Sequence, residues 1–246
     1  MLDLIIPDWP APRWIKAYTT TRHGGFSQAP FDSLNVSLRV GDNPACVIKN
    51  RQLLQSSLGL KQQPLWLKQV HGNTVISADH LTNTLAADAI YSKNQQTVCA
   101  VQTADCLPLL ICSVSNYCIA AVHAGWKGLS NGILENAILA LECPPRDLLV
   151  WLGPAIGPQA FIVGEDVVQA FISKDHATQT AFHDIGHNKW RANLYALAKQ
   201  RLNKLGINTV YGGKYCTYTD PKRFFSYRRD QVTGRMLSFI WINPNL

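Results

Sequence analysis

The stretch that best indicates the fold runs from Ala120 to Gly128 and reads AAVHAGWKG. The apolar run Tyr117–Val122 predicts a buried strand, which ends at His123 and is followed by a glycine-rich turn. A helical pattern then begins near Ser130. Because α/β proteins tend to bind ligands where a strand gives way to a helix N-terminus, His123 is the first candidate functional residue.

The composition is that of a globular protein with a large core. Of the 246 residues, 47% are hydrophobic and 16% are charged. No apolar run reaches the roughly 18 residues of a membrane span, and the N-terminus lacks the features of a secretory signal peptide. The seven cysteines include no CxxC pair, which favours reduced thiols over a disulfide framework. We therefore expect a cytoplasmic protein with no membrane partner.

The chain is basic, with a net charge of +7. This excess indicates either a basic surface or a pocket for an anionic substrate such as phosphate. The basic residues are scattered apart from Lys222-Arg223 and Arg228-Arg229, and no nucleic-acid-binding motif is present. We therefore expect no nucleic-acid partner.

Hydrophobic periodicity predicts alternating strands and helices. The expected strands are Arg13–Thr20, Leu65–Val70, Ala87–Ser92, Thr97–Thr103, Pro108–Ser113, Tyr117–His123, Asp147–Leu152, Thr209–Gly212 and Met236–Ile242. The expected helices are Pro44–Leu58, Ser130–Glu142, Gly164–Ile172 and Trp190–Leu205. Strands this close together need hairpins, so at least part of the sheet is antiparallel. With no repeat and no linker, the prediction is one α+β domain over residues 1–246, with mixed sheets covered by helices.

The first predicted helix carries an arginine on its apolar side. Val47, Leu54 and Leu58 form the inward stripe, and Arg51 stands at the position between them. An inward arginine is costly unless it meets an anion or a carboxylate. Arg51 is therefore either a structural residue or a ligand of a substrate anion.

Two other residues share the setting of His123. His71 follows the predicted strand Leu65–Val70 and precedes Gly72, while Cys106 interrupts two apolar strands. Two imidazoles and one thiolate suit zinc, and three protein ligands leave the fourth position open, as in catalytic zinc sites. Alternatively, Cys106 is a nucleophile with His123 or His71 as its base, or the three residues are unrelated. Asp105 is a poor orienting partner for Cys106, because adjacent side chains usually point apart.

Three motifs carry a family resemblance: QVHG at 69–72, TADCLP at 103–108 and HAGWKG at 123–128. They resemble the signature motifs of the YfiH (laccase-domain) family. Further similar segments, in the family's order, are Thr21–Gly25, Leu34-Asn35, Val40–Asp42, Asn50-Arg51, Leu152–Gly157, Phe225–Asp230 and Gly234–Met236. Two positions depart from the family pattern: His23 stands where a hydrophobic residue is usual, and Lys127 where arginine is common.

The resemblance implies a single-domain α/β/β/α fold and a metal held by His71, Cys106 and His123. It also implies phosphorolysis of adenosine, inosine, guanosine or methylthioadenosine, together with deamination of adenosine. An older description of the family is copper-dependent polyphenol oxidase, or laccase. The family is also likened to cysteine hydrolases and associated with editing of peptidoglycan precursors, which would suit Cys106 as a metal-free nucleophile.

The residues argue against a four-copper oxidase. Such an enzyme needs many histidines, commonly as His-X-His pairs, whereas this chain has seven histidines and no such pair. A blue-copper site also favours a nearby methionine, and the chain has only Met1 and Met236. Copper could still occupy the two-His, one-Cys site, because it binds such ligands more tightly than zinc does.

Purine chemistry therefore gives the primary hypothesis: a zinc-dependent purine nucleoside phosphorylase and adenosine deaminase. The partners would be a purine nucleoside and phosphate, and the assembly a monomer or a small homo-oligomer. Arg51 is the leading phosphate ligand, with Arg22, Lys127 and Arg228 as weaker candidates. From motif position alone, Asn35 and Gln69 are assigned to the ribose or the base.

Overall fold

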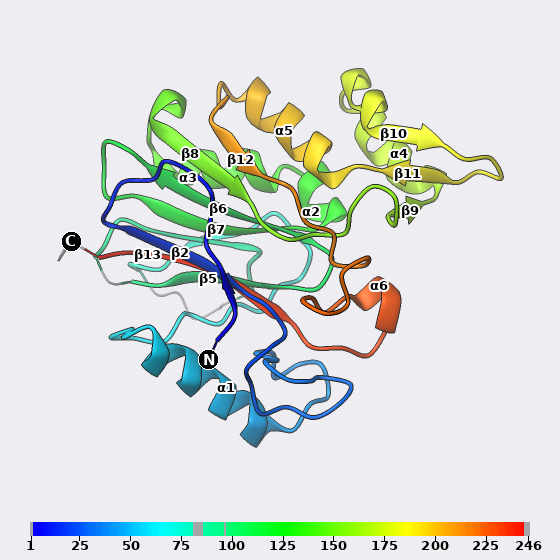
Figure 1. The fold of residues 1–246 in the computed structure, drawn as a ribbon. Helices are drawn as coiled ribbons and strands as arrows, with labels where there is room; N and C mark the ends of the chain where they lie inside the picture. The colour runs from blue at the N-terminus through cyan, green and yellow to red at the C-terminus, as the bar shows by residue number, and fades with distance from the viewer. Residues whose placement is uncertain (1, 81–85, 96, 244–246) are drawn as a thin grey trace.

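Two β-sheets lie face to face at the centre of the protein, and helices cover their outer faces (Figure 1). A computed structural model describes residues 2–80, 86–95 and 97–243. The four-stranded antiparallel sheet has the order β1 (Leu4–Ile5), β2 (Ile15–Thr20), β13 (Met236–Ile242) and β5 (Cys99–Thr103). Its strands come from both ends of the chain and from the middle, so strand β13 near the C-terminus pairs with β2 near the N-terminus.

The six-stranded sheet is mixed. Its order is β12 (Val210–Gly212), β8 (Leu148–Leu152), β6 (Leu107–Ser113), β7 (Ile119–Ala124), β4 (Ala89–Ser92) and β3 (Val75–Ser77). The two edge pairs, β12 with β8 and β3 with β4, are parallel, while the central pairs are antiparallel. The antiparallel pairing predicted from the short strand spacing is therefore present in the centre of this sheet, where β6 and β7 form a hairpin.

The helices lie in two outer layers. α1 (Pro44–Ser57) covers the four-stranded sheet, and α3 (Ile133–Leu141) and α5 (Leu194–Lys204) lie on the opposite side of the molecule (Figure 1). The remaining elements are α2 (Trp126–Ser130), α4 (Glu165–Ile172), α6 (Tyr227–Asp230) and a small sheet of β9 (Ile162–Val163), β11 (Trp190–Ala192) and β10 (Phe182–Asp184). Two 3₁₀ turns occur at Pro145–Asp147 and His176–Ala181.

Alternation along the central strands explains the layers. In β6, Leu109 and Ile111 pack into the core beneath α3 and α5, whereas Leu110 and Cys112 pack into the core between the two sheets. Each strand side chain points to the face opposite its neighbour's, so a strand that is apolar throughout can bury both faces. The α/β/β/α arrangement and the α+β class predicted from the sequence are confirmed. In the described part of the chain, no helix has the length and apolarity that crossing a membrane requires.

Two of the predicted elements form different structures. Residues 65–70 form no strand; instead, the side-chain amide of Gln69 bonds to the backbone of Gln102, with N–H···O distances of 2.7 and 2.8 Å. Trp190–Ala192 is strand β11, and α5 begins only after Asn193, whose side chain caps it by accepting from the Ala196 amide. In each case hydrogen bonds of a polar side chain, which periodicity does not reveal, accompany the difference: the bonds of Gln69 are long-range and the cap of Asn193 is local.

The helix after His123 starts earlier than predicted. Gly125 is the N-cap of α2, which runs to Ser130, and the chain then breaks at Gly132 in a left-handed conformation before α3 begins. Glycine reaches a positive φ without strain, which allows the break. The helix N-terminus therefore lies within two residues of His123.

Candidate active site

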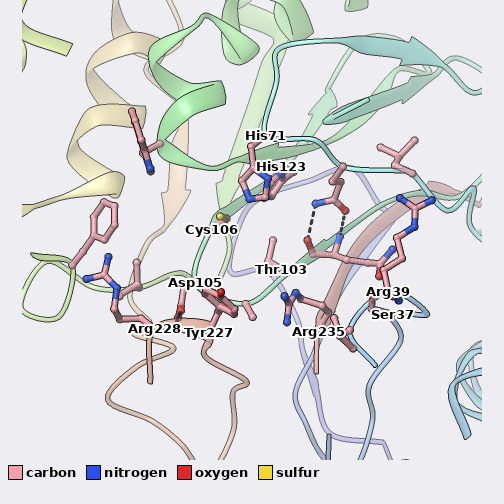
Figure 2. A pocket seen from close by; sticks show the side chains of 18 residues that line it. Ser37, Arg39, His71, Thr103, Asp105, Cys106, His123, Tyr227, Arg228 and Arg235 are labelled. Atoms are coloured by element: carbon pink, nitrogen blue, oxygen red, sulfur yellow. Dashed lines mark hydrogen bonds between the residues drawn. The ribbon is translucent and has the colours of Figure 1, made fainter. Parts of the chain in front are cut away.

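His71, Cys106 and His123 come together from three elements, as the sequence predicts. Their candidate ligand atoms all lie within 4.8 Å of one another, and the two imidazole rings are 4.9 Å apart between centroids. Figure 2 shows both histidine side chains beside the Cys106 sulfur. Within the described residues, this is the one group of three or more His, Cys, Asp or Glu side chains that could hold a metal ion.

The β6–β7 hairpin explains the meeting of Cys106 and His123. Pro108 pairs with His123 and Leu107 with Ala124, so Cys106, one residue before β6, lies beside the end of β7. His71 arrives from the turn that precedes β3, two strands away in the same sheet. The turn residues His71 and Asp105 have positive φ values of 59° and 87°, which side chains other than glycine seldom adopt. Such strained conformations often occur at functional sites.

Gly125 keeps the space among the three side chains open. A Cβ at this position would lie 3.1 Å from both Cys106 Sγ and His71 Cδ2, and 3.7 Å from His123 Cε1. The donor set of two nitrogens and one sulfur matches the ligands of catalytic zinc, and the missing Cβ leaves the region clear of protein atoms. The residues therefore fit a metal ion.

Charge is concentrated in this group. Burial opposes ionisation of the Cys106 thiol, but the charge and hydrogen bonds of His123, with those of His71, lower its pKa to about 6. Burial likewise opposes protonation of His123, but the Cys106 thiolate and the Asp88 carboxylate raise its pKa to about 9. The site thus favours the thiolate, the form of cysteine that binds metals and acts as a nucleophile.

Asp88 is a buried acidic residue beside this group that the sequence analysis did not identify. Its carboxylate is fully buried and accepts a hydrogen bond from His123 Nδ1 at 2.8 Å. Burial raises the pKa of Asp88, but the bonds from His123 and the Gly72 amide outweigh burial and lower it. Asp88 precedes β4, and only the β4–β7 register brings it beside His123.

A cavity of about 600 Å³ opens beside the three side chains. It is lined by Ser37, Arg39, Val40, Leu67, Gln69, His71, Gln102, Thr103, Ala104, Asp105, Cys106, His123, Trp126, Ile156, Phe161, Tyr227, Arg228 and Arg235. In the view of Figure 2, Arg39 and Arg235 lie on one side of Cys106 and Arg228 on the other. The cavity therefore combines the candidate metal ligands with cationic walls.

Among the residues predicted to bind substrate, Gln69 and Arg228 line this cavity. Gln69 is held by the backbone of Gln102. Arg228 donates its Nη1 to the Ile162 carbonyl at 2.9 Å, and its guanidinium lies 5.4 Å from the centre of the Phe161 ring. Arg228 is therefore fixed against an aromatic wall.

Arg51 and Arg22 are not among the residues that line the cavity. Arg51 stacks on Trp66, with its guanidinium carbon 3.5 Å from the ring centre, and donates to the Val36 carbonyl at 2.9 Å. Burial and the charge of Arg39 lower the pKa of Arg51 to about 10. Arg22 binds Asp32 through both the carbonyl and the carboxylate. In both cases the structure shows intramolecular partners for the guanidinium.

Asn35 and Lys127 also lie outside the cavity lining. Asn35 is fully buried, donates to the Asp42 carboxylate at 2.8 Å and accepts from the Arg235 amide at 3.0 Å, so it supports the loops that carry the cavity arginines. Lys127 is exposed on α2, with its ammonium 5.6 Å from the Trp126 ring centre.

Arg39 and Arg235 line the cavity but were not among the phosphate ligands predicted from the sequence. Arg235 lies in the segment Gly234–Met236 and is held by carbonyls of Thr233 and Gly234, and burial lowers its pKa. Motif position was the available signal for Arg235. Arg39 follows an irregular loop and had no signal beyond its charge.

The Asp105 carboxylate bonds to residues other than Cys106, as expected from the sequence. Its two carboxylate oxygens accept from Thr217 Oγ1 and from the Arg228 amide, each at 2.6 Å. The residue therefore joins the Cys106 turn to the segment that carries Arg228.

Together, these features define an α+β protein with a three-donor metal-ligand group at the side of an arginine-lined cavity. The chain belongs to the family described as multi-copper polyphenol oxidoreductase laccase, which matches residues 16–243. The YfiH (laccase-domain) resemblance predicted from the motifs is thereby confirmed.

Named relatives cover nearly the whole chain. The purine nucleoside phosphorylase YfiH of Escherichia coli is 48% identical over 246 residues, covering 98% of this chain and 100% of the relative. A purine nucleoside phosphorylase of Haemophilus influenzae is 47% identical over 242 residues, covering 98% and 99%. The crystal structure of Neisseria meningitidis protein NMB0706 superposes with a TM-score of 0.94 at 46% identity, covering 98% of this chain and 99% of that one. The crystal structure of the YfiH protein of Bacillus licheniformis gives a TM-score of 0.86 at 29% identity, covering 94% of each chain.

The family description and the relatives' names point to different chemistry. A multi-copper oxidase combines several copper sites, whereas the described residues offer a single three-donor group. The relatives are named for phosphorolysis, which requires an anionic co-substrate. The arginine-lined cavity suits the second chemistry better.

Proposed function

We propose that the protein is a zinc-dependent purine nucleoside phosphorylase that also deaminates adenosine. The observation that carries this proposal is the cavity itself, in which one wall holds the two-His, one-Cys group and another holds Arg39 and Arg235. The names of relatives at 47% and 48% identity support the phosphorolysis part of the proposal. The expected nucleosides are adenosine, inosine, guanosine and methylthioadenosine.

Phosphate would bind beside Arg39 and Arg235. Within the described chain, neither guanidinium forms an ion pair with a carboxylate. Positive charges left without carboxylate partners in a concave site favour an anion, and guanidinium groups match the geometry of phosphate oxygens. The phosphate assignment made for Arg51 from the sequence thus passes to Arg39 and Arg235.

The purine base would lie against aromatic side chains. Trp126, Phe161 and Tyr227 line the cavity, and Arg228 rests over Phe161. Flat apolar faces suit a purine ring, because offset stacking adds to the burial of apolar area. The ribose would then lie between the base and the phosphate. Attack of a phosphate oxygen on the anomeric carbon would form ribose 1-phosphate and release the base.

His71, Cys106 and His123 would hold the metal ion. Bound zinc would polarise an oxygen or lower the pKa of a water molecule, which is the chemistry that deamination requires. The chain itself contributes the fixed donors, the clear space at Gly125 and the two histidines that lower the pKa of Cys106. All seven cysteines carry free thiols, which supports a reducing, cytoplasmic setting as part of the proposal.

Incubation of the purified protein with adenosine and phosphate tests the proposal. Adenine, ribose 1-phosphate and inosine are the expected products, with turnover that falls on chelation and returns with zinc. Absence of all three products would overturn it. Elemental analysis of protein made without added metal separates zinc from copper, and oxygen uptake with a phenol after addition of Cu(II) tests the oxidase alternative.

A metal-free cysteine hydrolase is the second candidate. The lowered pKa of Cys106, caused by the adjacent histidines, favours it, because an ionised thiol is a nucleophile. Its substrate would be an amide, such as a peptidoglycan precursor. Amide hydrolysis that persists in metal-stripped enzyme and is lost on alkylation of Cys106 would support this candidate, whereas activity that requires zinc would count against it.

A further inference from the structure

One buried carboxylate contacts both halves of the histidine pair. Oδ1 of Asp88 accepts from His123 Nδ1 at 2.8 Å and from the His71 amide at 2.9 Å. Oδ2 accepts from the amides of Gly72 at 2.7 Å and Val70 at 3.2 Å. The carboxylate is 0% exposed, so its four bonds replace water completely.

We infer that Asp88 is a positioning residue that sets the tautomer of His123 and the backbone turn of His71, and thereby presents both imidazoles to one metal ion. This inference rests on the metal site of the proposed function. It assigns the two histidines a common support, so that one substitution would disturb both ligands by different routes.

The tautomer of His123 follows from the charge of its partner. A carboxylate can only accept, so His123 must carry a proton on Nδ1 to make the 2.8 Å bond. In the neutral ring this leaves Nε2 with a free lone pair, the form that binds metal. The His123 amide also donates to the Asp88 carbonyl at 2.7 Å, so ring and backbone are fixed by the same residue.

The turn at His71 is held through its backbone. Three consecutive amides, those of Val70, His71 and Gly72, converge on the carboxylate. The convergence requires the positive φ of 59° at His71, a conformation that is unfavourable for a residue with a Cβ. Without a negative acceptor, the turn would lose the bonds that compensate for this strain, and His71 would leave its place beside Cys106.

Asp88→Asn tests the inference with little change in shape. If the new amide group replaces Oδ2, it faces the Gly72 and Val70 amides, and donors oppose donors. If it replaces Oδ1, it faces the His71 amide and donates to His123 Nδ1, which moves the ring proton to Nε2 and blocks metal binding. Either orientation therefore impairs one of the two histidines.

Asp79→Asn is the matched control. Asp79 also accepts from a side chain and a backbone amide, Ser92 Oγ at 2.5 Å and Lys93 N at 2.7 Å, but among the described residues it bonds to neither His71 nor His123. Zinc affinity would be measured by competition with a chromophoric chelator, on variants whose folding is checked by circular dichroism. We expect Asp88→Asn to bind zinc about 10- to 100-fold more weakly, and Asp79→Asn to bind it like the wild type. A folded Asp88→Asn protein with wild-type zinc affinity would overturn the inference.

A measurement on the unaltered protein covers the case in which Asp88→Asn does not fold. In zinc-loaded protein with ¹⁵N-labelled histidine, nuclear magnetic resonance should show His123 protonated at Nδ1 and coordinated through Nε2. The opposite tautomer would overturn the inference. Neither readout uses a nucleoside, so an inactive protein with both expected results would sink the proposed function and leave the role of Asp88 standing.

Discussion

The two ends of the cavity are built in different ways. The metal-ligand end, defined by His71, Cys106 and His123, stands on strand ends and turns whose backbone is bonded to a buried carboxylate. The arginine end, defined by Ser37, Arg39 and Arg235, stands on loops that a buried asparagine, Asn35, holds together. The first end is held by the pairing register of the strands. The second is held by side-chain hydrogen bonds between segments that are distant in sequence. Substitutions at the first end should therefore affect metal binding, and those at the second should affect phosphate alone.

The largest effect is expected from Cys106→Ser. A serine hydroxyl is a far poorer zinc ligand than a thiolate, so zinc affinity and turnover of adenosine with phosphate should each fall by at least about 100-fold. Elemental analysis and steady-state kinetics measure the two. Cys143→Ser is the control, since Cys143 is half-buried and donates to the Leu141 carbonyl, as serine can. Full metal content and turnover in Cys106→Ser would show that Cys106 is not a metal ligand.

Gly125→Ala should have the next largest effect. The added Cβ would press on Cys106 Sγ and His71 Cδ2 at 3.1 Å, and the donors would have to move by a few tenths of an ångström. We expect zinc affinity to fall by about 10-fold, with a changed absorption spectrum of the Co²⁺-substituted protein. An unaltered spectrum and affinity would mean that the metal lies away from Gly125.

The metal-ligand end could be predicted from sequence because its signals are local. His71, Cys106 and His123 each end or interrupt an apolar run. Cys106 and His123 meet where β6 pairs with β7, whereas His71 lies in a turn, because residues 65–70 form no strand. Asp88 had no such signal, because it sits in a buried segment and acquires its role through the pairing of β4 with β7. Hydrophobic periodicity predicted mixed sheets covered by helices, and the family resemblance implied the α/β/β/α layers, but neither predicted β11 or the break at Gly132.

The assignment of phosphate to Arg51 from the sequence shows why the rest could not be predicted. In α1 the buried residues are Val47, Asn50 and Leu54, so the helix buries an asparagine and not the arginine beside it. Asn50 is satisfied by distant partners: it donates to Ser27 Oγ and the Asn35 carbonyl and accepts from the Phe26 amide. Periodicity alone favours whichever residue leaves the longer apolar stripe, and it cannot anticipate bonds to a loop some 20 residues away.

Arg39→Gln and Arg235→Gln test the phosphate assignment. Each removes one cation from the cavity wall, and the loss of a charged hydrogen bond should raise the KM for phosphate by roughly 10-fold while changing the KM for nucleoside little. Arg146→Gln is the control, because its side chain is 87% exposed at another surface. A rise in the nucleoside KM without a rise for phosphate would place the base, rather than phosphate, at this end.

The smallest effect on activity is expected from Arg51→Gln. This variant tests whether phosphate binds Arg51, as predicted from the sequence, or Arg39 and Arg235, as proposed from the structure. The guanidinium stacks on Trp66 and bonds to the Val36 carbonyl, so its loss should lower the free energy of unfolding by about 1 kcal/mol. For a chain of this size that corresponds to a melting temperature lower by about 2–4 °C, measurable by calorimetry. The KM for phosphate should stay unchanged, because the side chain is directed to Trp66 and not into the cavity lining.

Arg51→Lys sharpens the test: lysine keeps the charge but loses the planar stacking, so it should reproduce the loss of stability. If Arg51→Gln instead raises the KM for phosphate as far as Arg39→Gln does, while Arg51→Lys restores it, then Arg51 acts on the anion through its charge. The arginine end would then extend to α1.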